Sequence, residues 1–201
     1  MRERAPTGSD AVDQLRANAA ACRRCPLWSG ATQTVFGEGP RAARAILAGE
    51  QPGDREDIVG RPFVGPAGRL LDVALERAGL SRGDLYLTNA VKHFKNEPRG
   101  KKRLHKTPTA GEIDACRFWL DQELALVDAP VVIALGATAL RGLGGTAFRG
   151  ATISSLRGRA LSLGARKLIV TVHPAAILRV RDSLARAQEM ARFVEDMAAA
   201  R

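Results

Sequence analysis

Residues 45–71, "AILAGEQPGDREDIVGRPFVGPAGRLL", decide the fold. The stretch begins with a short apolar run that ends at Gly49, continues through a segment rich in glycine and proline, and enters an apolar pattern of helical period at Ala67. A run of this length is too short for an independent helix and is typical of a buried strand. The stretch therefore predicts a strand, a loop and a helix in succession.

The same alternation recurs along the chain. Three further apolar or β-branched runs predict buried strands, at 85–91, 131–136 and 167–173. Helical patterns occupy 67–79, 110–127 and 181–201, and an alanine-rich first helix is expected from about Ser9 to Ala21. Strands that alternate with helices predict a parallel sheet covered on both faces. The expected fold is one α/β domain over residues 1–201, with three layers (α/β/α) around a four-stranded parallel sheet.

Composition limits the class of protein. The chain has 201 residues, of which 45% are hydrophobic, and no apolar run approaches twenty residues, so we expect no membrane span. The first residues, "MRERAPTGSDAVDQL", lack the apolar core of a secretory signal, which predicts a cytoplasmic protein. Lysine and arginine number 31 against 21 acidic residues, a net charge of +10. Nucleic acid is therefore the leading partner, and a merely solvated basic surface is the alternative.

Unusual residues gather where the predicted strands end, which is where parallel sheets bind their ligands. The four segments concerned are "GEQPGD", "TNAVKH", "GATAL" and "HPAAILR". A glycine group at 141–145, "RGLGG", lacks the Lys-Ser/Thr of a phosphate loop and is predicted to be a turn. The functional site is expected at one edge of the sheet.

Three segments, "GEQPGDREDIVGRPFVGPAGRLL", "YLTNAVK" and "HPAAILR", resemble the motifs of the uracil-DNA glycosylase superfamily, nearest its iron-sulfur branch. The resemblance runs from about Cys22 to Arg179. It implies a tight pocket that reads a base pulled out of the DNA stack. Phe63 would stack on the ring, Asn89 would pair with the O4 and N3 edge of uracil, and His173 would donate to O2.

The resemblance also assigns Gly49 and Asp54 to the substrate site. Taken singly, each pocket residue has an ordinary structural alternative: a core phenylalanine for Phe63, a turn-capping amide for Asn89 and a helix N-cap for His173. The joint pattern favours the functional interpretation over these alternatives.

The three cysteines indicate metal or redox chemistry rather than a disulfide framework. In the iron-sulfur branch, four cysteines hold a [4Fe-4S] cluster, and the position of the third ligand, just after the "TNxVK" strand, is His93 here. The implied ligands are Cys22, Cys25, His93 and Cys116, with residues 9–28 contributing to the site. A Cys3His zinc site and free thiols are the alternatives. A structural and a redox-sensing role for the cluster both remain open.

A strongly basic segment runs from Lys92 to Lys106 and overlaps the stretch "RGKKRLHKTP". It carries seven lysines and arginines against one acid, Glu97, and is expected to be a loop that contacts phosphates. Part of it, "GKKRLHK", resembles the insertion of X-type uracil-DNA glycosylases, whose histidine bonds covalently to the DNA that it has made abasic. His105 is the matching residue, and Arg103 would steady the loop or a flanking phosphate.

The resemblance also implies why capture would replace hydrolysis. Gln51 stands where the best-known hydrolytic members carry an aspartate that activates water, and an amide cannot act as a base. His105 would then attack the oxocarbenium-like sugar left by uracil. Glu50 would bond the other ring nitrogen of the imidazole and fix its tautomer.

The sequence thus predicts a monomeric DNA-repair glycosylase that excises uracil, including from single-stranded DNA, and becomes joined to the abasic site. It would lie at the nucleoid when bound to DNA. Leu178 and Arg179 would wedge into the gap left by the flipped base. The rival hypotheses are a hydrolytic glycosylase with multiple turnovers and a non-catalytic iron-sulfur protein that binds DNA.

Overall fold

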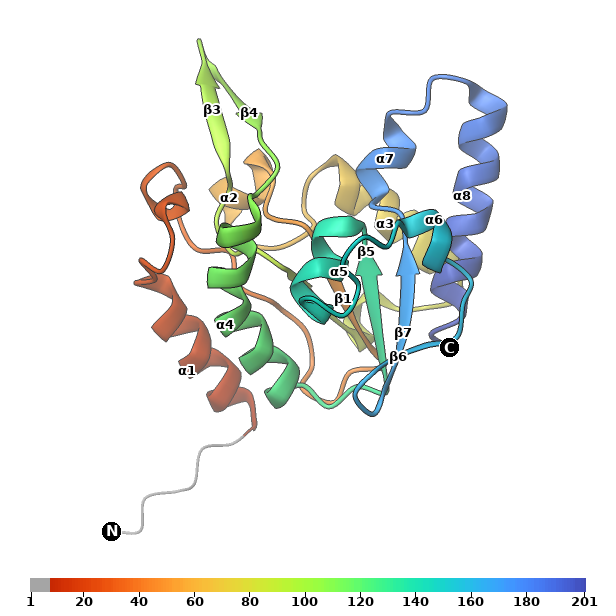
Figure 1. Cartoon of the computed structure of the whole chain (residues 1–201), viewed down its shortest axis with the longest axis horizontal. Coiled ribbons are helices and arrows are strands. Elements are labelled where there is room, and N and C mark those ends of the chain that lie inside the picture. Colours follow the sequence, from red (N-terminus) through yellow and green to blue (C-terminus); the bar gives the residue numbers. More distant parts are fainter. Residues whose placement is uncertain (1–7) are drawn as a thin grey trace.

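A mostly parallel sheet forms the centre of the computed structural model, which describes residues 8–201, with side chains from residue 11 onward (Figure 1). Its strand order is β2-β1-β5-β7-β6. The strands are β1 (Ala45–Gly49), β2 (Leu85–Asn89), β5 (Val131–Leu135), β6 (Leu161–Leu163) and β7 (Arg166–Thr171). The first four in this order pair in parallel, and β6 is antiparallel to β7. The predicted α/β fold is confirmed, with one antiparallel edge strand more than the four expected.

Helices cover both faces of this sheet. One face carries α3 (Pro66–Arg77), α7 (Pro174–Leu178) and α8 (Ser183–Ala198), and the other carries α1 (Gly8–Ala20), α4 (Ala110–Leu126) and α5 (Ala137–Gly144). Shorter helical segments are η1 (Pro26–Ser29), α2 (Asp54–Val59), η2 (Arg82–Asp84) and α6 (Ile153–Leu156). The three-layer arrangement follows from strands that are buried along their whole length.

The alternation of side chains along β1 divides the core between the two layers of helices. Ala45 and Leu47 point toward the layer of α3 and α8, where they join Leu71 and Phe193. Ile46 and Ala48 belong to the opposite cluster, together with side chains of α4 and α5. Successive residues of a strand face opposite sides, so a strand with no polar residue requires cover on both.

The glycine group at 141–145 is not the turn that we predicted. Gly142 and Gly144 lie within α5, which ends at Gly144. A Cβ on Gly142 would lie 2.6 Å from the Cβ of Ala90, so the missing side chain allows α5 to pack closely against the end of β2. Tertiary packing therefore outweighs the low helix propensity of glycine here.

The basic segment is a hairpin rather than an irregular loop. β3 (Asn96–Arg99) and β4 (Lys102–His105) pair antiparallel with each other and with no strand of the large sheet, and Asn96 lies opposite His105. In Figure 1 the hairpin projects above the edge of the sheet where the parallel strands end. Gly100 has a positive φ of 59°, which suits the tight turn. Over residues 8–201, no helix has the length and apolar character that crossing a membrane requires.

Candidate active site

A pocket of about 530 Å³ opens at the carboxyl ends of the parallel strands. It joins the strand-end loops after β1, β2 and β7 to the base of the hairpin. Nine of the residues singled out from the sequence line it: Glu50, Gln51, Asp54, Phe63, Asn89, His105, His173, Leu178 and Arg179. Two others, Gly49 and Arg103, do not line the pocket. Gly49 contacts Phe63 and Asn89, and Arg103 contacts Asp54 and Asp57.

Phe63 is held on the pocket wall by an unusual backbone conformation. Its φ is +55°, in the left-handed region that costs a residue other than glycine about 1–3 kcal/mol. A Cβ on Gly68 would lie 1.9 Å from the carbonyl oxygen of Phe63, so only glycine lets α3 begin this close. Arg82 donates from Nη1 to the same oxygen at 3.3 Å. These contacts hold the backbone of Phe63 in place and thereby set the position of its ring.

Gly49 allows Phe63 and Asn89 to meet. A Cβ at this position would lie 2.4 Å from Asn89 Oδ1 and 2.6 Å from Phe63 Cζ. Both side chains therefore occupy space that any larger residue at the end of β1 would fill. An aromatic ring and a buried amide, with its donor and its acceptor, converge beside one strand end.

A buried ion pair supports Asn89 from below. Lys92 Nζ donates to the backbone oxygen of Asn89 at 2.7 Å and lies 2.5 Å from Glu123 Oε2. Glu123 also accepts hydrogen bonds from Thr88 and Tyr86. The sequence interpretation counted Lys92 among phosphate contacts, which is wrong because its side chain is fully buried. The sequence did contain a signal for this buried pair: Lys92 follows an apolar strand, and Glu123 lies in a helix predicted to cover the sheet.

His173 serves as the N-cap of α7 and points its other nitrogen to the pocket. Its Nδ1 accepts the backbone N–H of Ala175 at 3.2 Å, so the neutral ring carries its proton on Nε2. Burial, with smaller contributions from the nearby His105 and Arg179, lowers the pKa of His173 to about 4. The ring stacks on Phe63 with centroids 6.3 Å apart. The capping role and a donor role are therefore compatible.

His105 ends β4 and faces the carboxylate of Glu50 across the pocket mouth. Its Nε2 lies 3.4 Å from Glu50 Oε1, and 41% of its side chain is exposed. The other carboxylate oxygen, Oε2, accepts a hydrogen bond from Thr138 Oγ1 at 3.0 Å. Oε1 is buried and has no hydrogen-bond partner among the described residues. Thr138 lies in the segment "GATAL" that was expected at this edge of the sheet, but it was assigned no role of its own from the sequence.

Gln51 fastens both strands of the hairpin at its base. Its Oε1 accepts the backbone N–H of Lys95 at 3.0 Å, and its Nε2 donates to the carbonyl oxygens of Lys95 and Lys106 at 3.2 and 3.1 Å. The amide is fully engaged with backbone groups on the two sides of His105. A carboxylate in its place would lose both donated bonds.

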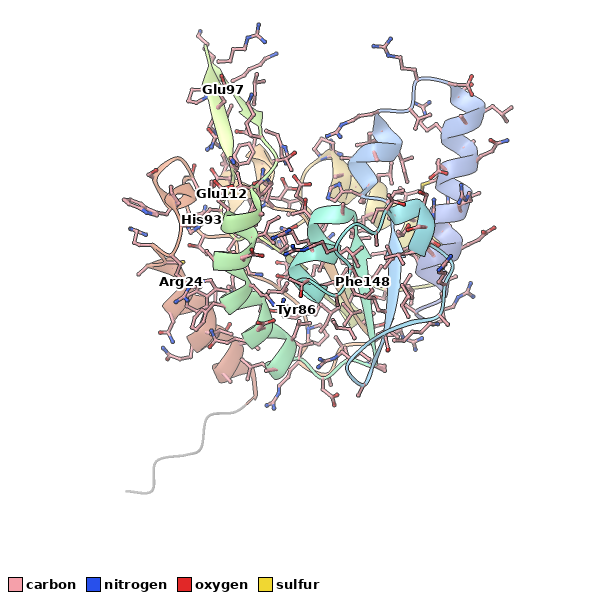
Figure 2. The ribbon with its side chains drawn as sticks, viewed as in Figure 1. Arg24, Tyr86, His93, Glu97, Glu112 and Phe148 are labelled. Atoms are coloured by element: carbon pink, nitrogen blue, oxygen red, sulfur yellow. The ribbon has the colours of Figure 1, made fainter. Side chains whose placement is uncertain are left out.

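Arg103 fastens the hairpin to α2. It reaches Asp54 Oδ1 at 2.7 Å and the fully buried carboxylate of Asp57 at 2.5 Å. Asp54, expected in the substrate site, therefore lines the pocket, but its carboxylate is ion-paired with Arg103. Two other basic residues of the segment are also paired, Lys95 with Glu112 and Lys106 with Glu97; Figure 2 labels both acids. Three cations near the turn, Arg99, Lys101 and Lys102, form no ion pair with the side chains described in residues 11–201.

The three cysteines share one apolar cluster beneath η1, where Cys22 and Cys116 are buried. Trp119 Nε1 donates to Cys22 Sγ at 3.1 Å, and the backbone N–H of Lys92 donates to Cys116 Sγ at 3.2 Å. Burial raises the pKa of the Cys116 thiol to about 12. The N–H group aimed at Cys116 offsets only part of this burial effect by favouring the thiolate, which is the form that binds iron.

His93 approaches the same region from β2. The ring is buried, and its Nε2 lies 2.9 Å from the hydroxyl of Thr34, which in turn donates to the carbonyl oxygen of Ala19. Burial and the nearby Arg23 lower the pKa of His93, so the imidazole is the neutral form that ligates metals. In residues 8–201 no three metal-binding side chains converge on a single ion. A cluster of four irons spans more space than one ion, and the donor set fits one chemically.

The fold and the pocket define an α/β protein with its ligand site at the carboxyl edge of a parallel sheet. Residues 36–198 match the family described as the uracil DNA glycosylase superfamily. The chain is 36% identical over 162 residues to a type-4 uracil-DNA glycosylase of Thermotoga maritima, covering 81% of this chain and 80% of the relative. It is 38% identical over 164 residues to a type-4 uracil-DNA glycosylase of Pyrobaculum aerophilum, covering 79% and 80%. A type-5 uracil-DNA glycosylase of Thermus thermophilus is 37% identical over 135 residues, covering 60% and 57%. The chain belongs to the uracil DNA glycosylase superfamily.

Proposed function

We propose that the protein excises uracil from DNA, including single-stranded DNA, and that His105 then captures the abasic sugar covalently. The observation that carries the first part is the convergence of Phe63, Asn89 and the Nε2–H of His173 in one pocket. The similarity to type-4 uracil-DNA glycosylases supports the substrate. We propose that the chain acts as a monomer, since one chain supplies every residue required.

In the first step, the bond between N1 of uracil and C1′ of the sugar breaks, and its electron pair leaves with uracil. Charge develops on O2 of the leaving base, where Nε2–H of His173 donates. Because this hydrogen bond strengthens as the charge grows, it stabilises the transition state more than the ground state. A neutral histidine keeps its proton here and needs only to donate a hydrogen bond.

In the second step, a nitrogen of His105 attacks the cationic C1′. The structure turns Nε2 toward Glu50, so the nitrogen that does not face Glu50 carries the lone pair. A bond forms between that nitrogen and C1′, and the proton on the facing nitrogen passes to the Glu50 carboxylate. The product is a neutral substituted imidazole, which is a poor leaving group. The hairpin thus supplies the nucleophile, His105, in a site where Gln51 is unable to act as a base and activate water.

A specific observation favours a second candidate, hydrolysis with multiple turnovers. Glu50 Oε1 is buried and free of hydrogen bonds among the described residues, so it is able to hold a water molecule near C1′. Water and His105 would then compete for the same cation. The pairing of Oε1 with His105 favours capture over hydrolysis.

A denaturing gel of the protein with uracil-containing single-stranded DNA tests both steps. We expect a shifted covalent band, released uracil, and a peptide map that places the DNA on His105. Free abasic DNA without a shifted band would leave uracil excision standing and refute capture. Absence of released uracil would refute the proposed function as a whole.

We further propose that Cys22, Cys25, Cys116 and His93 hold a [4Fe-4S] cluster. The support is the shared thiol cluster, its N–H donors and the neutral imidazole. When bound, the cluster would join the segment before η1 to α4 and to the end of β2. We expect protein purified without oxygen to be brown and to contain iron and sulfide in equal amounts, and Cys116→Ser to lose the iron. A colourless zinc protein would contradict the assignment.

A further inference from the structure

A second hollow lies beside the active-site pocket and is lined by residues of α3, α7 and α8. Figure 1 shows where these three helices lie. Its volume is about 630 Å³, and its floor is apolar, made by Leu70, Val73, Ile177 and Met190. Val73 is 41% exposed, which is high for a valine in a helix that covers the sheet. This groove, as we call it below, is thus an apolar surface that the described chain leaves uncovered.

Three arginines surround the groove: Arg69 and Arg77 from α3, and Arg186 from α8. All three are exposed, and their side chains form no ion pair or hydrogen bond within residues 11–201. No acidic side chain lines the groove. Of the acids close to these arginines in sequence, Asp72 pairs with Arg82, Glu189 pairs with Arg157 and Asp182 caps α8, while Glu76 is exposed but does not line the groove. The lining of the groove therefore holds three positive charges and no negative charge.

The groove is continuous with the active-site pocket. Pro66 and Leu178 line both hollows, and Leu178 stands between them with 45% of its side chain exposed. A strand that leaves its flipped nucleotide in the pocket meets this groove on passing Leu178. His105 brings the end of β4 to the pocket, and Figure 1 shows the hairpin well apart from α7 and α8.

We infer that the groove binds the DNA strand on one side of the flipped nucleotide. Its apolar floor accepts a base, and Arg69, Arg77 and Arg186 contact the phosphates on either side of that base. This inference rests on the proposed function. Charge and continuity distinguish DNA from the other occupants, an acidic peptide or a second copy of the chain. A base seated there holds the strand in register with the pocket.

The test compares two single-stranded oligonucleotides, one extended only 5′ of the uracil and one extended only 3′. A 2′-fluoro group on the deoxyuridine disfavours the cationic sugar and keeps the DNA intact for binding measurements. The variant R69Q/R77Q/R186Q removes the charge of the groove. The control R44Q/R149Q/R159Q removes the same charge from exposed arginines outside both hollows, which likewise form no ion pair among the described residues.

We expect the groove variant to bind one of the two oligonucleotides about tenfold to a hundredfold more weakly and the other as tightly as the control does. Loss of three phosphate contacts on a single strand lowers the slope of log affinity against log salt by about 2. Equal affinity of both variants for both oligonucleotides would overturn the inference. So would an equal loss on both flanks, or a change in the mass of the protein in sedimentation, which would indicate a second copy in the groove.

A second variant tests the floor of the groove. Val73→Asp places a charge on an exposed position of α3, so the fold is retained, and it should weaken binding of the same oligonucleotide as the arginine variant. Leu184→Asp, at a position of α8 that is 67% exposed and outside the groove, is the control. Unchanged binding by Val73→Asp would show that no base enters. Uracil release from unmodified DNA by the wild type, measured in parallel, separates failure of the proposed function from failure of this inference.

Discussion

The two sides of the active site are built in different ways. The side with Phe63, Asn89 and His173, which we propose reads the base, is continuous with the core, and glycines and buried hydrogen bonds fix its shape. The hairpin side is an exposed ribbon that pairs with no strand of the large sheet and is attached by the polar side chains of Gln51 and Arg103. We therefore propose that excision and capture depend on separate parts of the molecule, which mutations should distinguish.

The largest effect is expected from His105→Ser. The covalent band should disappear completely, because serine offers no nitrogen to C1′, while uracil release continues with water in the vacated space. Gel shift and released uracil are measured on the same samples. If uracil release disappears together with the band, the two sides are not independent, and His105 takes part in breaking the glycosidic bond.

On the opposite side, His173→Ala should slow uracil release by about 100-fold to 1,000-fold, the usual loss when one preorganised donor to a developing oxyanion is removed. Adduct formation should slow by the same factor, because capture follows excision. Single-turnover rates of both products check this. His173→Asn is the informative companion, since an amide is able to cap α7 and still donate a hydrogen bond. A larger loss of adduct than of uracil release would contradict the assignment.

Arg103→Gln should loosen the hairpin and reduce the rate of capture by about tenfold, with uracil release unchanged. The reason is that the ion pairs with Asp54 and Asp57 hold β4 in place, and positioning within a fraction of an ångström governs such attack. Lys101→Gln is the control, because it removes a charge from the same hairpin without an ion pair. Equal effects of the two variants would indicate a role in phosphate binding instead.

The smallest effect concerns pH. His173 has a pKa of about 4 in the folded chain against an ordinary value of about 6.5, so it stays neutral through that range. Uracil release by the His105→Ser variant should therefore show no inflection near pH 6.5. The free energy of unfolding should fall as the pH drops from about 6.5 toward 4. Over this range His173 becomes protonated in the unfolded chain but stays neutral in the folded chain. His173→Asn should flatten that fall in thermal unfolding.

The sequence was most informative where the backbone is buried. "AILAG" was predicted as a strand and is β1 residue for residue, because an unbroken apolar run must be covered on both faces. The hairpin was not predicted, since "NEPR" and "KRLH" show no alternation, and its position depends on side-chain bonds to residues far away in sequence. Lys92 was misassigned for a related reason: a charge in a sequence does not reveal whether a partner such as Glu123 is buried beside it.

The turn of the hairpin is a suitable site for attaching a label. A side chain added at Gly100 would meet no other atom within 4 Å, and the two strands end their pairing there with Arg99 opposite Lys102. Because the hairpin contributes no strand to the large sheet, a dye or a short affinity tag inserted at this tip would leave the folded body unchanged. On the capture mechanism proposed above, the protein would then serve as a reagent that marks uracil in DNA and carries its label on the hairpin that holds His105.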